Sequence, residues 1–450
     1  MPIGYAWRAV SSLESFRFLH TGDLHLDSPL EGLSSEAPPE IRGTLRAATT
    51  DAWRNVVDLA LREKVDFVVI AGDVFEVASP TLLGQTRFRD GLARLAAANI
   101  PSFVVHGNHD PADGVAWSPS LAFPALAHRF GTAAGESAPV LRDGREIARI
   151  HGRSYPRPAV TENYATGMRG ADGAPFNIGL LHTNVGDRPG HANYAPCSLD
   201  DLRASGMDYW ALGHIHQPGK IVDDPPAYYS GIPQGRDPGE LGARGCFLVD
   251  VDAGGRVTAS FVATDVVRWQ PIDLPITDLR DDEALMAAAR VAIGAALEEA
   301  DERSLVVRLR LSDRGPLHAS ATRPGYVDHL KLLLSEEFDG VRPFAWVESV
   351  RDATRSEVDL DVRRETPDFV GDFLRTVSAA RRSARSTDPE EHARWQALLR
   401  SSVASLFEES PRGRRYLRAT APDDELLVGD IIDDAEALGL DLLLAVEGDG

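Results

Sequence analysis

Five short motifs combine aspartate, asparagine and histidine in a pattern that could hold metal ions. In chain order they are Gly22-Asp23-Leu24-His25, Gly72-Asp73, Gly107-Asn108-His109-Asp110, the single His182, and Gly213-His214-Ile215-His216. On an extended backbone, Asp23 and His25 would point to the same side, so both could reach one metal. Imidazole, carboxylate and amide oxygen suit hard-to-borderline divalent ions such as Mn²⁺.

The charges of this set suit two divalent ions. Asp23 and Asp73 neutralise half of the positive charge that two such ions bring, and the histidine and asparagine ligands are neutral. The remaining charge attracts phosphate and lowers the pKa of water, which makes a nucleophile near neutral pH. We therefore expect a centre that hydrolyses phosphate esters. His109 adjoins a ligand, so we expect it beside the leaving group as an acid or a transition-state donor.

Each motif follows an apolar segment that is typical of a strand. The predicted strands are residues 16–20, 65–71, 102–106, 178–182 and 209–212, and segments of helical spacing at 52–63 and 87–98 separate the first three. This alternation predicts an α/β layered domain, whose ligands bind where the strands end. An isolated histidine is more often structural, and we interpret His20, His106 and His151 in that way. Five ordered motifs in one type of position favour a functional site.

The remaining chain predicts further elements and domains. Residues 247–252 and 257–263 are predicted to pair as strands around a Gly254-Gly255 turn. The pattern changes near residues 266–275, and helices at 281–300 and 329–337 then alternate with strands at 305–311 and 344–350. Beyond residue 352 the chain is charged and predicted to be mostly helical, most clearly at 389–409. We expect an N-terminal extension (1–15), a catalytic domain (16–265), a small α/β domain that covers the metal cleft and recognises DNA (266–350) and a mainly helical, acidic C-terminal region (351–450).

The composition limits the function and the partners. The 450 residues carry a net charge of −21, which disfavours a free-standing DNA binder but not a nuclease whose metals contact phosphate. Residues 423–450 are acidic, without lysine or arginine, yet rich in leucine and isoleucine, so we expect them to bury against the chain's own core or a partner. The sequence shows neither a bilayer-length apolar run nor a signal-like N-terminus, so we expect a cytoplasmic protein without a membrane partner. The two cysteines, Cys197 and Cys246, are expected to be reduced and do not suggest a zinc site.

The order D-x-H, G-D, G-N-H-D, H, G-H-x-H resembles that of the calcineurin-like metallophosphoesterases. Within them the chain is similar to the SbcD family of DNA-repair nuclease subunits, and especially to its YhaO-like branch. The segments that carry this resemblance are residues 20–29, 152–156, 181–184, 195–199, 231–236 and 363–369. The resemblance implies a four-layer α+β sandwich with a small α/β capping domain and a helical C-terminal region. It also implies a metal-dependent DNA nuclease of an SbcCD-like repair complex, with exonuclease activity expected and endonuclease activity left open.

The resemblance further implies a role for each residue of the site. Asp73 would bridge two ions, which we expect to be Mn²⁺, with Mg²⁺, Fe²⁺ and Zn²⁺ as alternatives. His109 would be the catalytic histidine. The first ion would bind Asp23, His25 and His216, and the second Asn108, His182 and His214. The implied partners are DNA, an SbcC-type SMC-like ATPase and a second copy of the chain.

Four further residues are candidates to support the site or to grip phosphate. Some relatives carry a histidine where this chain has Glu76, which would either orient His109 by hydrogen bonding or be a solvated acid. Asp110, Arg153 and Arg236 complete the set. With only three lysines in the sequence, contacts to a phosphate backbone would fall mainly to arginine.

Two other classes of function remain open from the sequence. A general metallophosphatase or a cyclic-nucleotide phosphodiesterase would use the same metal core. A binding subunit without catalysis is disfavoured by the intact ligand set, whereas a platform role in a larger machine is compatible with a nuclease. The sequence contains no G-x-x-x-x-G-K-[ST] loop, so any dependence on ATP must come from a partner.

Overall fold

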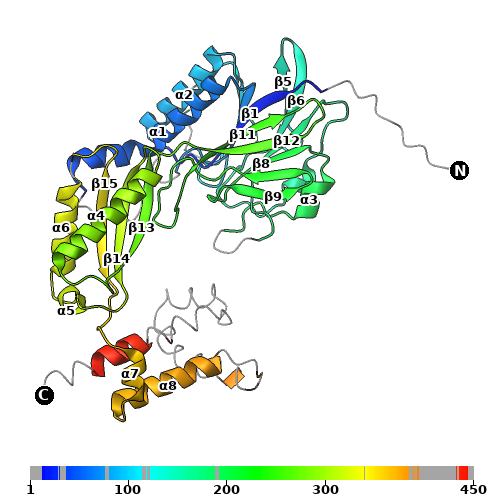
Figure 1. Cartoon of the computed structure of the whole chain (residues 1–450). Coiled ribbons are helices and arrows are strands. Elements are labelled where there is room, and N and C mark those ends of the chain that lie inside the picture. The colour runs from blue at the N-terminus through cyan, green and yellow to red at the C-terminus, as the bar shows by residue number, and fades with distance from the viewer. Residues whose placement is uncertain are drawn as a thin grey trace. The chain divides into compact units, whose positions relative to one another are not determined.

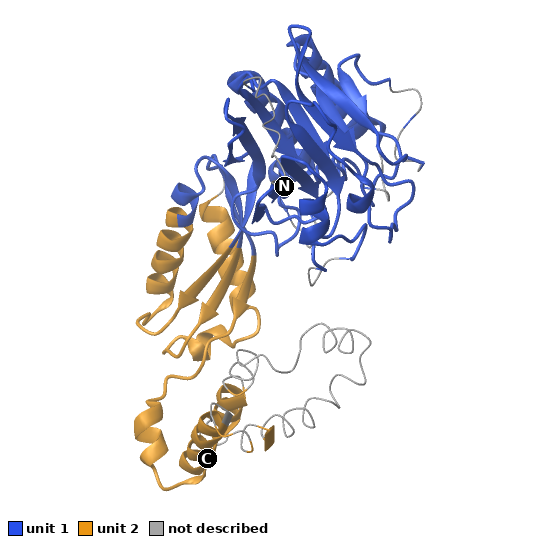
Figure 2. Ribbon diagram, turned by 90° about the vertical axis from the view of Figure 1, so that its right-hand side faces the viewer, with its two compact units in different colours: residues 1–270, 296–307, 339–348 blue, residues 271–295, 308–338, 349–450 orange. Residues whose placement is uncertain are grey.

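The computed structural model divides into two compact units, coloured blue and orange in Figure 2. It describes residues 13–28, 30, 37–76, 81–113, 118, 122–187, 192–338 and 340–384, with short pieces at 388, 390, 393–394, 432 and 435–443. Unit 1 comprises residues 1–270, 296–307 and 339–348, and unit 2 comprises residues 271–295, 308–338 and 349–450. The domain limits expected at residues 265 and 350 stay a prediction.

Unit 1 is built on two six-stranded sheets (Figure 1). The first has the order β12 (Val257–Ala263), β11 (Gly245–Val251), β1 (Phe16–Thr21), β2 (Phe67–Ala71), β3 (Ser102–Val105), β4 (Ala127–Arg129). The second has the order β5 (Ser137–Arg142), β6 (Arg145–Gly152), β7 (Asn177–His182), β8 (Tyr209–Gly213), β10 (Pro226–Tyr229), β9 (Gly219–Asp223). The central strands of each sheet run parallel, so their carboxyl ends share an edge.

The two sheets pack face to face around an apolar core. Phe18 and Phe67 of the first sheet stack with their ring centroids 4.8 Å apart, and Ile178 and Tyr209 of the second sheet belong to the same cluster. Helices α1 (Pro39–Glu63) and α2 (Leu82–Ala97) cover the outer face of the first sheet. The short helices η1 (Ala165–Gly167) and α3 (Leu199–Ala204), with nearby loops, cover the second. These layers confirm the α/β sandwich expected from the sequence.

The predicted limits of both long helices were wrong at their N-terminal ends. Helix α1 begins at Pro39 rather than near residue 52, and its first half buries Ile41 and Leu45 against Trp269 and Trp346. Helix α2 begins at Leu82 rather than residue 87, after Thr81, whose hydroxyl accepts a hydrogen bond from Gly84 N at 2.8 Å. The apolar residues of the first half of α1 face partners distant in sequence, which leave no local signal.

The predicted alternation of helices and strands after residue 280 is confirmed. Strands β13 (Val267–Pro275), β14 (Ser304–Ser312) and β15 (Ala345–Asp352) form a third sheet in that order. Between these strands lie α4 (Asp282–Glu299), α5 (His318–Ala321) and α6 (Tyr326–Glu337). The apolar pattern does not predict a strand at residues 267–275, nor does it predict β4, β5, β6, β9 and β10.

The described residues in the C-terminal part of unit 2 are mostly helical. It contains α7 (Leu360–Glu365), α8 (Phe369–Ala384) and a short helix at residues 435–443. In that short helix, Leu440 is fully buried against Val370 and Leu374 of α8, whereas Leu438 and Leu442 are 63% and 61% exposed. The described part of the acidic segment therefore packs partly on the chain's own fold.

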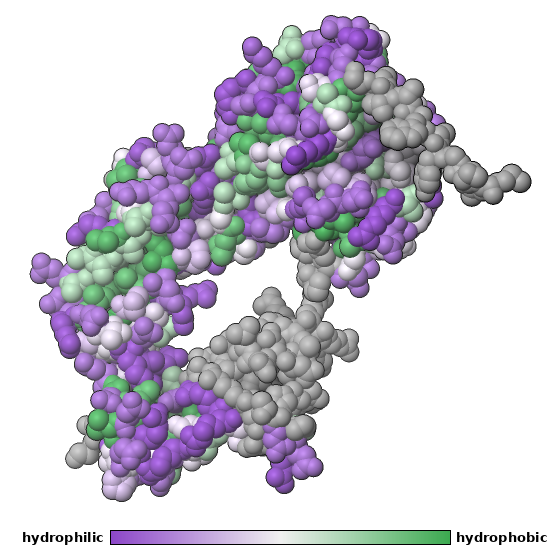
Figure 3. Space-filling view, turned by 45° about the vertical axis from the view of Figure 1, so that its right-hand side comes forward, coloured by the Kyte–Doolittle hydropathy of each residue, from purple (hydrophilic) through white to green (hydrophobic). Residues whose placement is uncertain are grey.

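Most of the predicted helix at 389–409 lies outside the described residues. Green areas in Figure 3 mark hydrophobic residues on the face drawn there. Among the apolar side chains of the described helices of unit 2, Val291 and Phe369 are exposed. Within the described part of the chain, no helix is both long and apolar enough to cross a membrane.

Candidate metal centre

The five motifs meet where the two sheets of unit 1 present their carboxyl ends. Three motifs follow β1, β2 and β3 of the first sheet, whereas His182 ends β7 and the last motif follows β8. His182 Nδ1 lies 3.0 Å from the carbonyl oxygen of Ala71 in β2. The backbone N–H of His214 donates to the Asp23 carboxylate at 3.1 Å. Both sheets therefore contribute to one site.

The backbone of the first motif differs from the prediction. Asp23 and His25 were expected on extended backbone, but their φ angles are 51° and 42°, and that of Asp73 is 48°. Asp23 N donates to Gly72 O at 2.9 Å, and His25 N to Asp73 O at 3.0 Å. These hydrogen bonds hold the two loops together. The three residues have a left-handed backbone conformation, which is rare for residues other than glycine and which, where it occurs, is often found at functional sites.

Two glycines of the motifs lie where neighbouring segments of the chain approach closely. A Cβ added to Gly107 would lie 2.2 Å from Asp73 Oδ1, and one added to Gly213 would lie 2.1 Å from Ala71 O. Neither contact is sterically tolerable. Gly107 and Gly213 are thus required because the space between the loops leaves no room for a Cβ.

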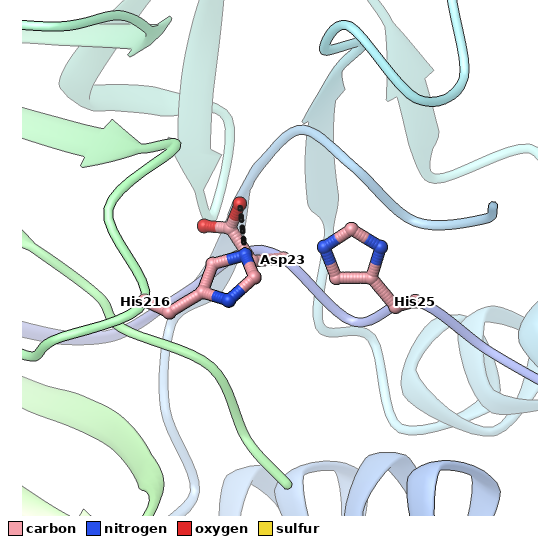
Figure 4. A group of neighbouring side chains, drawn as sticks. All are labelled: Asp23, His25 and His216. Atoms are coloured by element: carbon pink, nitrogen blue, oxygen red, sulfur yellow. Dashed lines mark ion pairs between the residues drawn. The ribbon is translucent and has the colours of Figure 1, made fainter. Parts of the chain in front are cut away.

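The first group of ligand atoms comes from Asp23, His25 and His216, which Figure 4 shows facing one another. Asp23 Oδ1 lies 3.9 Å from His216 Nε2. The rings of His25 and His216 have their centroids 5.2 Å apart. The structure thus brings together the three residues expected to hold the first ion.

The second group gathers around His182. Its Nε2 lies 2.9 Å from Asn108 Oδ1 and 3.2 Å from Asp73 Oδ2. The His214 ring lies 5.1 Å from the His182 ring between centroids, and its Nε2 is 2.7 Å from the carbonyl oxygen of Ala192. Asp73 Oδ2 also lies 4.0 Å from His25 Nε2, so this one oxygen faces both groups.

The residues present fit two divalent ions. His25 is completely buried, and although its Nδ1 lies 3.2 Å from Glu76, neither ring nitrogen meets the geometry of a hydrogen bond with a described residue. Buried polar atoms without a partner are costly, so an imidazole of this kind suits a metal ligand. The donors are nitrogen and oxygen without sulfur, a set that suits hard-to-borderline divalent ions.

The electrostatics show opposite charges packed into a buried space. Burial raises the pKa of Asp23 to about 6 and lowers that of His25 to about 3. Burial also opposes ionisation of Asp73 and His182, but their mutual attraction is stronger. It holds the pKa of Asp73 well below its ordinary range and raises that of His182 to about 9.

His109 is held from two sides. Its Nδ1 forms a short hydrogen bond with Glu76 Oε1, and its backbone N–H donates to Asp73 Oδ1 at 2.9 Å. Glu76 Oε2 also lies 3.5 Å from Arg236 Nη1. These contacts favour the orienting role of Glu76 over that of a solvated acid.

The other supporting candidates lie in different surroundings. The buried Asp110 accepts hydrogen bonds from Val74 N at 3.0 Å and Gly107 N at 2.8 Å, which joins the second and third motifs. Arg236 is buried and donates to Ser28 Oγ at 3.1 Å, while its Nε has no hydrogen-bond partner among the described residues. The Arg153 guanidinium lies 3.7 Å from the Tyr164 ring centre and pairs with Glu162, so its phosphate contact stays a prediction.

Sequence reasoning missed Glu240. Its carboxylate forms a short hydrogen bond with His216 Nδ1 and accepts one from Arg236 N at 2.6 Å. Burial opposes its ionisation, but His216 outweighs burial and lowers the pKa of Glu240 to about 2. A lone glutamate in a loop carries no motif, although it lies only four residues after Arg236.

His20 and His106 bond to Tyr209 and to the Asp110 backbone, as expected for structural residues.

The layered fold and this ligand set define a metallophosphoesterase. Residues 16–218 match the family model described as calcineurin-like phosphoesterase, and residues 269–355 match the middle domain of the metallophosphoesterase YhaO. The chain belongs to the calcineurin-like metallophosphoesterases.

Within this family the chain is similar to YhaO of Bacillus subtilis. The two are 34% identical over 349 residues, which cover 77% of this chain and 84% of YhaO. It is 27% identical over 220 residues to the DNA double-strand break repair protein Mre11 of Thermoplasma acidophilum, covering 45% of this chain and 56% of that protein. It is 25% identical over 291 residues to one of the subunits of the SbcCD nuclease of Bacillus subtilis, covering 56% of this chain and 72% of that protein.

Proposed function

We propose that the chain is a two-metal DNA exonuclease of an SbcCD-like repair complex, with endonuclease activity left open. The observation that carries the proposal is the position of Asp73, whose Oδ2 faces both His25 and His182. Asp23, His25 and His216 would hold one ion, and Asn108, His182 and His214 the other. Asp73 would bridge them, and Mn²⁺ is the ion we expect.

His109 is proposed to handle the proton of the reaction. Bound divalent ions supply Lewis acidity and a nucleophile from water near neutral pH. Because Glu76 engages Nδ1 of His109, Nε2 remains to hold a proton toward a leaving oxygen. Burial opposes the charged form, but Glu76 and then Asp73 raise the pKa of His109 above its ordinary value. A protonated His109 can then donate to the leaving group.

DNA is the proposed substrate because two relatives carry names that refer to DNA repair or to a nuclease. The buried Arg236, whose Nε is unsatisfied by the described residues, adds a guanidinium beside Glu76 for a phosphate contact. A general metallophosphatase or cyclic-nucleotide phosphodiesterase remains the alternative, since the same centre would serve it.

The test compares substrates under one set of conditions. Purified protein, with and without Mn²⁺, is given single-stranded DNA, double-stranded DNA and bis-p-nitrophenyl phosphate. We expect Mn²⁺-dependent DNA cleavage that exceeds hydrolysis of the small ester. Cleavage of the small ester alone would favour the alternative.

Two variants separate the proposed roles of His109 and Asp73. His109→Asn should lower turnover by about 10²–10⁴-fold with its metal content unchanged, because it removes an acid and no ligand. Asp73→Asn should lose metal and activity together. Elemental analysis of both proteins measures the difference, and metal loss from His109→Asn would show that its role is misassigned.

We further propose that the helices of the C-terminal region dock an SbcC-type ATPase. The helix at residues 435–443 buries Leu440 on α8 but exposes Leu438 and Leu442. An exposed apolar stripe of this kind suits a partner groove. The double variant Leu438→Asp/Leu442→Asp should retain DNA cleavage and lose co-purification with the ATPase. Retained co-purification would exclude this stripe.

A further inference from the structure

Unit 2 contains a cavity of about 700 Å³ that is lined by arginines. We call it the arginine pocket. Its positively charged side chains come from β14, from the segments that follow β14 and β15, and from helices α7 and α8: Arg310, Arg314, Arg355, Arg364 and Arg381. Three acids, Asp273, Asp313 and Glu436, also line it. The lining thus has a surplus of two positive charges in a chain whose net charge is −21.

Some of these arginines are neutralised by the chain itself. Arg310 pairs with Asp273 at 3.0 Å, with both side chains more than half exposed. Arg381 pairs with Glu436 at 2.5 Å, and Arg364 pairs with the exposed Asp361 at 2.6 Å. A guanidinium group carries five N–H donors, and each of these ion pairs occupies only part of that group.

Arg314 is half-buried and forms no ion pair among the described residues. Its Nη1 donates a hydrogen bond to the neutral carbonyl oxygen of Ser356 at 3.1 Å. Burial lowers the pKa of Arg314, and although Asp441 and Glu436 oppose this shift, neighbouring Arg355 adds to it. In Arg364, Nε is buried and has no hydrogen-bond partner in the described part of the chain. The pocket therefore holds a positive charge, that of Arg314, which no carboxylate of the described residues pairs with.

We infer that the arginine pocket binds closely spaced phosphate groups. Guanidinium groups match phosphate oxygens in paired hydrogen bonds, and several around one cavity suit more than one phosphate. The described residues that line the cavity include no aromatic side chain, so they offer a base no surface for stacking. The recognised chemistry is the phosphates themselves, from the polyphosphate chain of a nucleotide or from consecutive phosphates of a nucleic acid. This inference does not depend on the reaction at the metal centre.

The test is calorimetric titration of the full chain with inorganic pyrophosphate at low salt. A chelator is present so that metal ions do not bring pyrophosphate to the metal centre. We expect saturable binding that Arg314→Met and Arg364→Gln each weaken by about tenfold or more, because each removes charge-assisted hydrogen bonds. Arg290→Gln is the matched control, since Arg290 lies in α4, pairs with Glu337 and does not line the cavity.

Melting temperatures of the variants show that unit 2 stays folded, and Arg364→Gln serves if Arg314→Met does not fold. The proposal is overturned if pyrophosphate does not bind, or if all four proteins bind it equally. If pyrophosphate binds as expected, a nucleoside triphosphate and a single-stranded oligonucleotide are titrated in the same way. The one whose affinity falls in Arg314→Met is the source of the phosphates.

Discussion

At the scale of single residues, two glutamates hold two histidines of the metal centre. Glu76 bonds to His109, and Glu240 bonds to His216 through its Nδ1. Carboxylates in such positions fix the tautomer and orientation of the imidazole. The two glutamates have similar chemistry, but the proposed roles of their histidines differ, so their loss should have different consequences.

Glu76→Gln should lower kcat by about 10–100-fold with metal content retained, because a neutral amide holds the His109 imidazolium less well. Glu240→Gln should instead weaken metal binding by about 10–100-fold, because His216 is a proposed ligand. Metal titrations and turnover at saturating Mn²⁺ measure the two effects. Identical behaviour of the two variants would contradict this division of roles.

His20 should make the stability of unit 1 depend on pH. Burial lowers the pKa of His20 to about 3, while it bonds to Tyr209 and to Leu212 O. In the unfolded chain, the His20 imidazole takes up a proton below about pH 6.5. The contribution of His20 to stability is therefore complete above that pH and is lost as the pH falls toward 3. The loss amounts to at most about 1.4 kcal/mol per pH unit.

The variant His20→Gln isolates this effect, because the carboxylates that also titrate at low pH are the same in the variant and in the wild type. It should be less stable than the wild type at pH 7, and the difference in unfolding free energy should shrink at pH 5. Urea denaturation at both pH values measures it. A difference that is equal at the two pH values would show that His20 is not the titrating group.

At the scale of elements, the loops after the strands matter as much as the strands. A Cβ at Gly107 would collide with Asp73 Oδ1, so Gly107→Ala must displace the carboxylate or the loop. We expect weaker metal binding and a loss of about 1–3 kcal/mol of stability. Gly167→Ala is the control, because no atom of the described residues lies within 4 Å of its added Cβ. Metal titration and thermal melting of both variants test this, and equal behaviour would refute it.

The sequence predicted the strands of the site and where its motifs would lie along them. Apolar runs ending in Asp23, Asp73, Asn108, His182 and His214 carry a local signal, and the carboxyl edge of parallel strands brings such ends together. The left-handed backbone at His25 could not be predicted, because hydrogen bonds from a loop about fifty residues away impose it. The contacts of Glu240 were missed for the same reason, since only the tertiary fold places it beside His216.

At the scale of the whole molecule, residues beyond the phosphoesterase sheets complete unit 1. Trp346 and Trp269 pack against α1, far from them in sequence. Trp346→Ala should therefore destabilise the protein by about 3–5 kcal/mol. A chain ending at Ala263 should melt at a lower temperature and aggregate, because the buried face of α1 would be exposed.

Calorimetry and gel filtration measure both outcomes. Leu241→Ala serves as the control, because Leu241 is an exposed apolar residue of the same unit and its loss should change stability by less than about 0.5 kcal/mol. If Trp346→Ala has the same melting temperature as the wild type, the packing of α1 does not depend on this residue.

The division of the metal ligands between two sheets has a consequence for the order of events during synthesis. The first proposed ligand is Asp23 and the last is His216, so nearly the whole phosphoesterase part must be made before the proposed set is complete. Contacts between residues so distant in sequence form slowly, because a long loop must be closed first. A nascent chain that carries only the first sheet's ligands would lack the imidazoles of the second. We therefore expect the ions to be acquired after the sandwich has closed, with metal loading reporting the completion of folding.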